Sequence, residues 1–299
     1  MTRESLGIDL GGTKIEGIRM GADGKVLHRH RVPTEQEGGY EHILGRIAQL
    51  VSELETAGEG LPLGIGTPGS LSARDGLLKN SNTQCLNGQP IHEDLQKRLG
   101  RKIHLENDAN CFALAEARLG AGRDAAVAFG VILGTGVGGG IILSGRIWSG
   151  PQHIAGEWGH HKIIADGPLC YCGGRGCVES LLSGPALAEA YRAATGKIAD
   201  AEGILEALRD GDSAAREIFS TWIGHFGVAM ANVINILDPD AVVLGGGLSN
   251  IDEIYQLAPA AIAANLFNDE LRTPILRHHL GDSAGVLGAA LLAKSTDNG

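Results

Sequence analysis

Aromatic residues are scarce in this chain, since phenylalanine, tryptophan and tyrosine together make up 4 % of its 299 residues. Long apolar runs are missing as well, because the longest, AAVAFGVILG at 125–134, is about half the length that a membrane-spanning helix needs. Residues 1–12, MTRESLGIDLGG, contain no apolar segment of the kind found in secretory signals. We therefore expect neither a membrane protein nor an exported one.

Positively charged residues are also fewer than negatively charged ones. Lysine and arginine number 25 against 35 aspartates and glutamates, which gives a formal net charge of −10 at pH 7. Proteins that bind nucleic acids rely on lysine and arginine to neutralise the phosphates. The acidic balance of this chain therefore argues against a nucleic-acid partner.

Cysteine is rare too, and three of the five cysteines fall within one short segment, CYCGGRGCVE at 170–179. An odd number of cysteines without an export signal favours a reduced, cytoplasmic setting, where clustered cysteines bind metals more often than they form disulfides. One histidine from GEWGHH at 156–161 would complete a tetrahedral Cys₃His zinc site with Cys170, Cys172 and Cys177. Such a closed site is structural and would fix the loop. A disulfide, or free thiols, is the alternative.

Glycine, in contrast, is abundant, with 46 residues, and three glycine turns stand at the ends of predicted strands. Glycines let the backbone approach a ligand closely, and successive amides in such turns can bind phosphate oxygens. Three such turns predict an ATP site, although any single one could be a plain hairpin turn. The residues assigned to it are Gly11, Gly12, Thr13 and Lys14 in the first turn, Gly134, Thr135 and Gly136 in the second, and Gly246 and Gly247 in the third. Asp9, at the end of an apolar strand, is suited to hold hydrated Mg²⁺.

The alternation of strand and helix patterns predicts an α/β fold. Strands are expected at 6–20, interrupted by the GGTK turn, at 25–33 and at 102–108, and a helix with apolar residues at helical spacing between Ile43 and Leu54. Further helices are expected at roughly 184–196, 202–210 and 213–237.

Two domains are expected, a smaller one from residues 1–110 and 285–299 and a larger one from residues 111–284. The larger domain would carry the zinc loop and nucleotide contacts. The order of strand, glycine turn and strand at the amino terminus returns at 125–147, which indicates an internal duplication in which each half presents one glycine turn.

Two glutamates, Glu157 and Glu179, flank the cysteine segment. Carboxylates held in place by a metal-bound loop are good acceptors for the hydroxyl groups of a sugar. We interpret this pair as ligand-binding residues, whereas each one alone could be a solvated surface charge.

Together these segments resemble the ROK family, which contains repressors and sugar kinases. The resemblance covers essentially the whole chain, in family order, and implies an actin-like, ribonuclease-H-like ATPase fold with the active site in a cleft between two domains. It also implies ATP, Mg²⁺ and a structural zinc ion as cofactors, and a homodimer. The segments that carry it are DLGGTK at 9–14, Asn107-Asp108, GTGVGGG at 134–140, Glu157 with His160, CYCGGRGC with Glu179, and GGGLSN at 245–250.

By the same resemblance, Asp108 is the catalytic base that takes the proton from the 6-hydroxyl of a hexose as that oxygen attacks the γ-phosphate of Mg-ATP. The alternative role for Asp108 is a helix cap. His160 would both ligate zinc and contact the sugar, leaving His161 as a bystander. The residues assigned to the sugar are Gly69, Asn82, Asn107, Asp108, Glu157, His160 and Glu179.

The loop KNSNTQCLNGQP at 79–90 resembles the bacterial fructokinase branch, also called manno(fructo)kinases. D-Fructose, with mannose as a further substrate, is therefore the expected hexose. An N-acetylglucosamine kinase or a glucokinase of the same family, or a catalytically silent sensor of sugar and ATP, are the alternatives. A repressor is not expected, because the DLGGTK motif starts at residue 9 and leaves no room before it for a helix-turn-helix region.

Overall fold

The computed structural model describes residues 3–56 and 58–295, and these fold into two compact units. The first unit takes the chain up to Gly120, then Gly140–Ala155, and the chain from Leu280 onward. The second unit takes Ala121–Gly139 and Gly156–His279. The expected domain limits, 1–110 with 285–299 and 111–284, stay a prediction.

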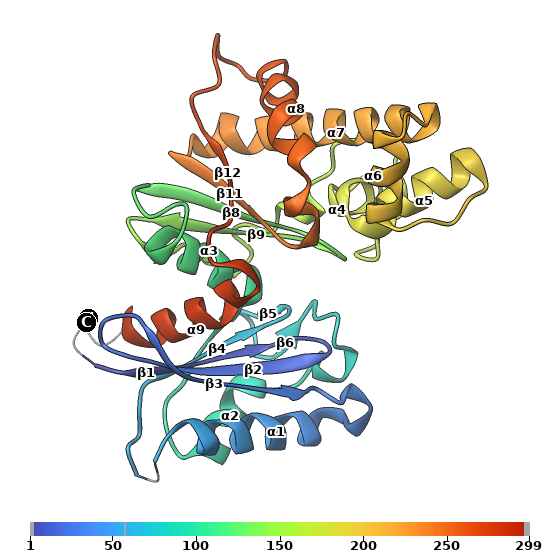
Figure 1. Cartoon of the computed structure of the whole chain (residues 1–299). Helices are drawn as coiled ribbons and strands as arrows, with labels where there is room; N and C mark the ends of the chain where they lie inside the picture. The colour runs from blue at the N-terminus through green and yellow to red at the C-terminus, as the bar shows by residue number, and fades with distance from the viewer. Residues whose placement is uncertain (1–2, 57, 296–299) are drawn as a thin grey trace. The chain divides into compact units, whose positions relative to one another are not determined.

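The first unit is built on a sheet of five strands in the order β3-β2-β1-β4-β7 (Figure 1). Strands β1, β2 and β3 are antiparallel neighbours, while β4 and β7 continue the sheet in parallel to β1. The elements of this unit are β1 (Ser5–Leu10), β2 (Lys14–Met20), β3 (Val26–Pro33), α1 (Gly39–Leu54), β4 (Leu63–Thr67), β5 (Ser70–Leu71), β6 (Leu78–Lys79), α2 (Ile91–Leu99), β7 (His104–Asn107), α3 (Asp108–Leu119), β10 (Arg146–Ile147) and α9 (Ala284–Ser295).

Two faces of this sheet are covered by different helices. Helices α1 and α2 lie on one face, and their apolar residues, such as Ile43, Ile47 and Leu95, join the buried side chains of β1 and β4 in one core. Helix α9 lies on the other face, beside α3 (Figure 1). The predicted strand at 102–108 is three residues too long, because β7 begins only at His104 and the last predicted residue, Asp108, already opens α3.

A second five-stranded sheet, β10-β9-β8-β11-β12, repeats the strand order β3-β2-β1-β4-β7, and its strands β8, β11 and β12 belong to the second unit. Strands β8, β11 and β12 are parallel neighbours. The elements are β8 (Val127–Leu133), β9 (Val137–Leu143, whose second half belongs to the first unit), α4 (Glu179–Leu182), α5 (Gly184–Thr195), α6 (Ala201–Arg209), α7 (Ser213–Leu237), β11 (Ala241–Gly245), α8 (Asp252–Ala263) and β12 (Ile275–Arg277).

Helix α7 is the centre of the helical layer in the second unit, since α4, α5, α6 and α8 all contact it. Its side chains Phe219, Trp222 and Phe226 stack in a row with ring centroids 5.8 and 5.9 Å apart. The expected range 213–237 for this helix is confirmed, as is the α/β class. Among the residues described, no helix combines the length and the apolar character needed to cross a membrane.

Candidate functional site

The turn between β1 and β2 is held from behind by a segment that follows β3. The Thr34 hydroxyl donates to the carbonyl of Gly11 at 2.7 Å, and the Thr34 amide donates to the carbonyl of Thr13 at 2.9 Å. The side-chain amide of Gln36 donates to the carbonyl of Gly12. All three carbonyls of the glycine turn are thus paired, which fixes the peptide planes that a phosphate group would meet. Sequence patterns gave no sign of Thr34 or Gln36, because both act on residues more than twenty positions away.

Asp9 lies in β1, just before this turn. The pKa of its carboxyl group is raised from 3.8 to about 7, mainly by desolvation and in addition by the neighbouring charges of Asp108 and Glu16. Gly285 in the first turn of α9 lies against this carboxyl group, since a β-carbon added there would lie 2.8 Å from Asp9 Oδ2. A carboxylate that is costly to ionise alone is stabilised by a hard cation, and Mg²⁺ prefers oxygen ligands of this kind. The Asp9 carboxylate therefore fits as one oxygen ligand of a magnesium ion.

Two neighbouring residues at the start of α3, Asn107 and Asp108, occupy different positions of the helix terminus. Asn107 is the helix cap, because its Oδ1 accepts from the amides of Ala109 at 2.9 Å and Asn110 at 3.3 Å. Its Nδ2 donates to the carbonyl of Gly69 at 3.0 Å. The alternative role considered for Asp108, that of helix cap, therefore falls to Asn107, and Asp108 is the first residue inside the helix.

Glu106 is a residue that the sequence interpretation missed. Its Oε1 accepts from the amide of Asn107 at 2.9 Å and from Asn110 Nδ2 at 3.0 Å, and its Oε2 accepts from the Ser149 hydroxyl at 2.8 Å. These bonds fix the end of β7, where Asn107 and Asp108 begin the helix. A charged residue inside a short strand was the one signal that could have indicated it.

One polar side chain of the loop at 79–90 forms hydrogen bonds within the loop itself. Asn87 accepts from the Ser81 amide and donates to the Ser81 carbonyl, both at 2.8 Å, so this side chain closes its own loop. Asn82 is exposed. A β-carbon on Gly69, which has a φ of +84°, would lie 2.4 Å from the Lys79 carbonyl, so glycine is required where the loop passes.

In the second unit, the four residues assigned to zinc come together. Their ligand atoms all lie within 4.8 Å of one another. Cys172 Sγ and Cys177 Sγ are 3.7 Å apart, and Cys170 Sγ is 3.7 Å from His160 Nδ1. Two sulfurs bound tetrahedrally at about 2.3 Å from one zinc ion would be roughly 3.8 Å apart, so the set fits zinc. His161 instead contacts Asn232 at 3.1 Å, as a residue outside the cluster.

The two glutamates that flank this cluster differ in what holds them. Glu179 is the first residue of α4, and its Oε2 accepts from the amide of Val137 at 2.9 Å. Glu157 precedes a short 3₁₀ helix, in which the Trp158 indole donates to the carbonyl of Gly138 at 2.8 Å. Both segments are thus tied to the glycine turn between β8 and β9.

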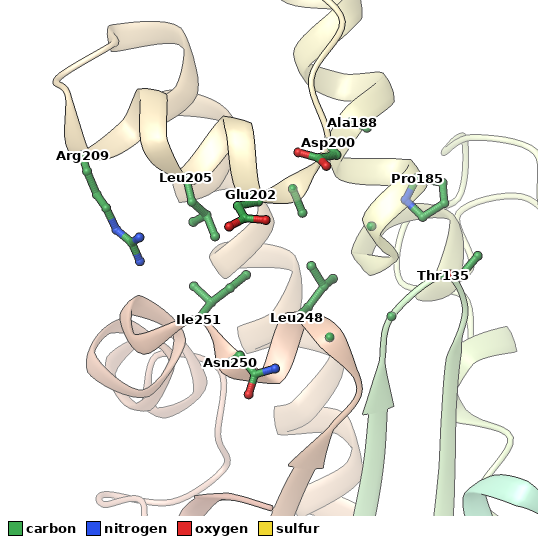
Figure 2. Close-up of a pocket in the computed structure, with 14 residues that line it drawn as sticks. Thr135, Pro185, Ala188, Asp200, Glu202, Leu205, Arg209, Leu248, Asn250 and Ile251 are labelled. Atoms are coloured by element: carbon green, nitrogen blue, oxygen red, sulfur yellow. The ribbon is translucent and has the colours of Figure 1, made fainter. Parts of the chain in front are cut away.

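A pocket of about 780 Å³ lies beside that same turn (Figure 2). Leu205 from α6 faces Leu248 and Ile251 from the segment after β11, and apolar walls of this kind suit a flat base. The charged residues at the pocket are already engaged in part, since Arg209 forms two bonds with Glu253 at 2.8 and 3.1 Å. The residues that line it are Gly134, Thr135, Gly184, Pro185, Ala188, Asp200, Ala201, Glu202, Leu205, Arg209, Gly247, Leu248, Asn250 and Ile251.

The pocket thus brings together Gly134, Thr135 and Gly247 of the residues assigned to ATP. Gly246 lies where the third turn packs closely on β8, because a β-carbon there would lie 2.3 Å from the Leu133 carbonyl oxygen. The contributions of α5 and α6 were not foreseen, since nothing in their amphipathic patterns distinguishes a pocket wall from an ordinary helix face.

The family model described as "ROK family" matches residues 5–296. The chain belongs to the ROK family. It is 40 % identical to the N-acetyl-D-glucosamine kinase of Vibrio atlanticus (strain LGP32) over 301 residues, covering 96 % of this chain and 98 % of the relative.

Two solved ROK structures are similar along nearly their full length. The ROK hexokinase from Thermus thermophilus is 34 % identical with a TM-score of 0.87, covering 97 % of this chain and 98 % of that one. A ROK family glucokinase from Streptomyces griseus, solved with glucose and AMPPNP, is 30 % identical with a TM-score of 0.79, covering 97 % and 99 %. The predicted actin-like, ribonuclease-H-like ATPase fold is thereby confirmed.

The ROK membership confirms the family resemblance but not the fructokinase branch. The relative above is named for N-acetylglucosamine, and this is one of the alternatives that the sequence left open. The fructokinase expectation rested on the loop at 79–90, in which the Asn87 side chain bonds to the backbone of Ser81.

Proposed function

We propose that this ROK protein is an ATP-dependent sugar kinase whose substrate is an N-acetylhexosamine, with N-acetylglucosamine the first candidate. The observation that carries the proposal is the 40 % identity to an N-acetyl-D-glucosamine kinase over 96 % of the chain. Fructose and mannose, the hexoses expected from the loop at 79–90, have no such support.

For the nucleotide, we propose that the nucleoside binds in the pocket beside β8 and β11. Its apolar residues Leu205, Leu248 and Ile251 would take the base, and the glycine turns would take the phosphates. Gly134, Thr135, Gly136, Gly246 and Gly247 are assigned to the phosphates from the second unit, and Gly11, Gly12, Thr13 and Lys14 from the first. A magnesium ion beside Asp9 would neutralise phosphate charge.

On the sugar side, Asp108 is proposed as the general base. As the 6-hydroxyl oxygen attacks the γ-phosphorus, its proton passes to the Asp108 carboxylate, the bond to the β-phosphate oxygen breaks, and ADP leaves with the electron pair. Asn107 and Glu106, bound to each other through backbone and side chain, keep the start of α3 in place for this.

The remaining sugar contacts are assigned to exposed or half-exposed polar groups. Carboxylates accept hydrogen bonds from sugar hydroxyls, and a zinc ion in the Cys₃His cluster would hold the loop that carries them. The groups proposed are Gly69, Asn82, Asn107, Glu157, His160 and Glu179.

A panel of sugars tests the proposal, with ADP release as the measurement. N-Acetylglucosamine, N-acetylgalactosamine, glucose, mannose and fructose are each supplied with Mg-ATP. We expect the highest kcat/KM with N-acetylglucosamine. Higher efficiency with fructose would overturn the proposed substrate, and no turnover with any sugar would favour the silent sensor.

A further inference from the structure

The pocket beside the second and third glycine turns is lined by three charged side chains, and two of them already have partners. Asp200 caps α6, because its Oδ1 accepts from the amide of Gly203 at 2.9 Å. Arg209 is paired with Glu253. Glu202, the second residue of α6, has neither a hydrogen bond nor an ion pair with any residue that the structure describes. Its carboxylate is therefore available to a ligand of the pocket.

Glu202 lies between the two ends of the pocket. Figure 2 shows its carboxyl group between Thr135, at the turn after β8, and Arg209, at the end of α6. Leu205 lies beside it on the same helix, and Asn250 lies across the pocket from it (Figure 2). A ligand that reaches from the glycine turn to the apolar side chains would pass this carboxylate.

The proposed nucleotide determines which groups such a carboxylate can meet. The ribose joins the phosphates, assigned to the glycine turns, to the base, assigned to the apolar side chains, so it lies between them. A carboxylate can only accept hydrogen bonds, and each hydroxyl group of a ribose can donate one. An adenine edge instead presents the N6 donor beside an acceptor, N7, which an amide such as that of Asn250 matches and a carboxylate does not. The ribose is therefore the better partner for Glu202.

We propose that Glu202 makes the nucleotide pocket selective for a ribose, by accepting a hydrogen bond from a ribose hydroxyl group of ATP. A carboxylate has the same task in dinucleotide-binding folds, where it accepts from the ribose 2′-hydroxyl. The inference rests on the proposed function, since it names a residue that selects the phosphate donor. A Glu202 that was only a solvated charge would repel the triphosphate, so its removal would leave ATP binding unchanged or tighten it.

The test compares Glu202→Ala with the wild type in calorimetric binding of Mg-ATP, Mg-2′-deoxyATP and Mg-3′-deoxyATP, without a sugar. We expect the wild type to bind ATP about 10-fold more tightly than the analogue that lacks the contacted hydroxyl, as for a hydrogen bond to a charged group. Glu202→Ala should bind ATP about 10-fold more weakly than the wild type, and should bind ATP and this analogue equally. Glu202→Gln keeps one acceptor oxygen and should retain part of the preference for ATP.

Glu206→Ala is the matched control. It removes the same charge from the same helix, at a residue that does not line the pocket, and should bind all three nucleotides like the wild type. Equal binding of the three nucleotides by the wild type, unchanged or tighter binding of ATP by Glu202→Ala, or an unchanged preference in that variant would overturn the inference and leave the kinase proposal intact.

Failures of the proposed function are recognised separately. A wild type that binds none of the three nucleotides would overturn ATP as the phosphate donor, and this inference with it. The comparison contains no sugar, so a sugar panel that rejects N-acetylglucosamine would overturn the proposed substrate without changing the result for Glu202.

Discussion

Two adjacent residues at the start of α3 have separate tasks. Asn107 is the cap and accepts from the amides of Ala109 and Asn110, while Asp108, the first residue inside the helix, shares the Ala109 amide at 2.8 Å. We expect Asp108→Asn to lower kcat by at least about 10²-fold, the low end of general-base contributions, because the amide cannot accept the sugar proton. Sugar affinity should change little. Steady-state kinetics with calorimetric binding checks this, and near-normal turnover would remove Asp108 from the role.

Asp9 predicts a pH dependence of stability. Its pKa is raised from 3.8 to about 7 in the folded chain, so the folded state binds this proton more tightly than the unfolded state. The stability that the group contributes is complete below about pH 4 and is lost as the pH rises to about 7. Asp9→Asn abolishes this titration, so its melting temperature should exceed that of the wild type by more at pH 8 than at pH 5.

Differential scanning fluorimetry without added magnesium measures this difference. Adding Mg²⁺ should stabilise the wild type more than Asp9→Asn, since the ion favours the ionised carboxylate. An equal difference between the two proteins at both pH values would show that Asp9 does not titrate in this range.

Residues with local signals could be predicted, and residues that act at a distance could not. The Cys₃His cluster follows from spacing, because its three cysteines are within eight positions and the four ligand atoms lie within 4.8 Å of one another. Thr34, Gln36 and Glu106 were not predicted, because each forms hydrogen bonds with groups that are distant in the sequence and come close only in the fold. The position of Tyr171 against His160 likewise depends on how the loop closes.

At the scale of elements, α9 depends on glycine for its close packing. A β-carbon on Gly288 would lie 1.8 Å from the Cys111 carbonyl in α3, and one on Gly64 in β4 would lie 2.0 Å from the Ala289 carbonyl. Gly288→Ala should therefore lower the free energy of unfolding by about 1–3 kcal/mol or more, as overpacking does.

The matched control is Gly224→Ala in α7, where nothing lies within 4 Å of the added carbon. There the substitution should stabilise by up to about 1 kcal/mol, because alanine is the better helix former. Urea denaturation of both variants measures the contrast. Equal effects of the two substitutions would contradict the packing argument.

We propose that the segment 157–179, which carries the Cys₃His cluster, depends on a bound metal for its fold. It contains two isolated strand bridges, Lys162 with Cys177 and Leu169 with Arg175, and no longer ladder within its described residues. We expect about one zinc ion per chain, and on chelation the segment 157–179 should become sensitive to protease while both sheets persist. Metal analysis that finds no zinc in freshly purified reduced protein would decide against the site.

Long elements were easier to predict than short ones. The 25 residues of α7 carry many turns of apolar spacing, so its range could be predicted correctly. The two-residue strands β5, β6 and β10 contain too few residues for any periodicity. The four-residue helix α4, which positions Glu179, was missed for the same reason.

At the scale of the whole molecule, the two halves of the chain use one topology twice. Both five-stranded sheets have the same strand order, and each places a glycine turn after its first strand, as the internal duplication implied. The substrate class could not be predicted in this way, since it depends on a few side chains rather than on the topology.

Oligomeric state also belongs to this scale, and the homodimer stays a prediction. Light scattering after size exclusion should give a mass about twice the 31.1 kDa of one chain. A single species at the mass of one chain, over the concentration range used for kinetics, would contradict it.

The bond from the Val137 amide to the Glu179 carboxylate joins two places that are assigned to different ligands. Val137 follows the turn that borders the pocket proposed for the nucleotide, while Glu179 follows Cys177, the last cysteine of the proposed zinc site, by two positions. If binding at one end changes this bond, binding at the other end is affected too, and thermodynamic reciprocity requires the two effects to be equal. By whatever factor a nucleotide analogue tightens the hold on the sugar, the sugar must tighten the hold on that analogue by the same factor.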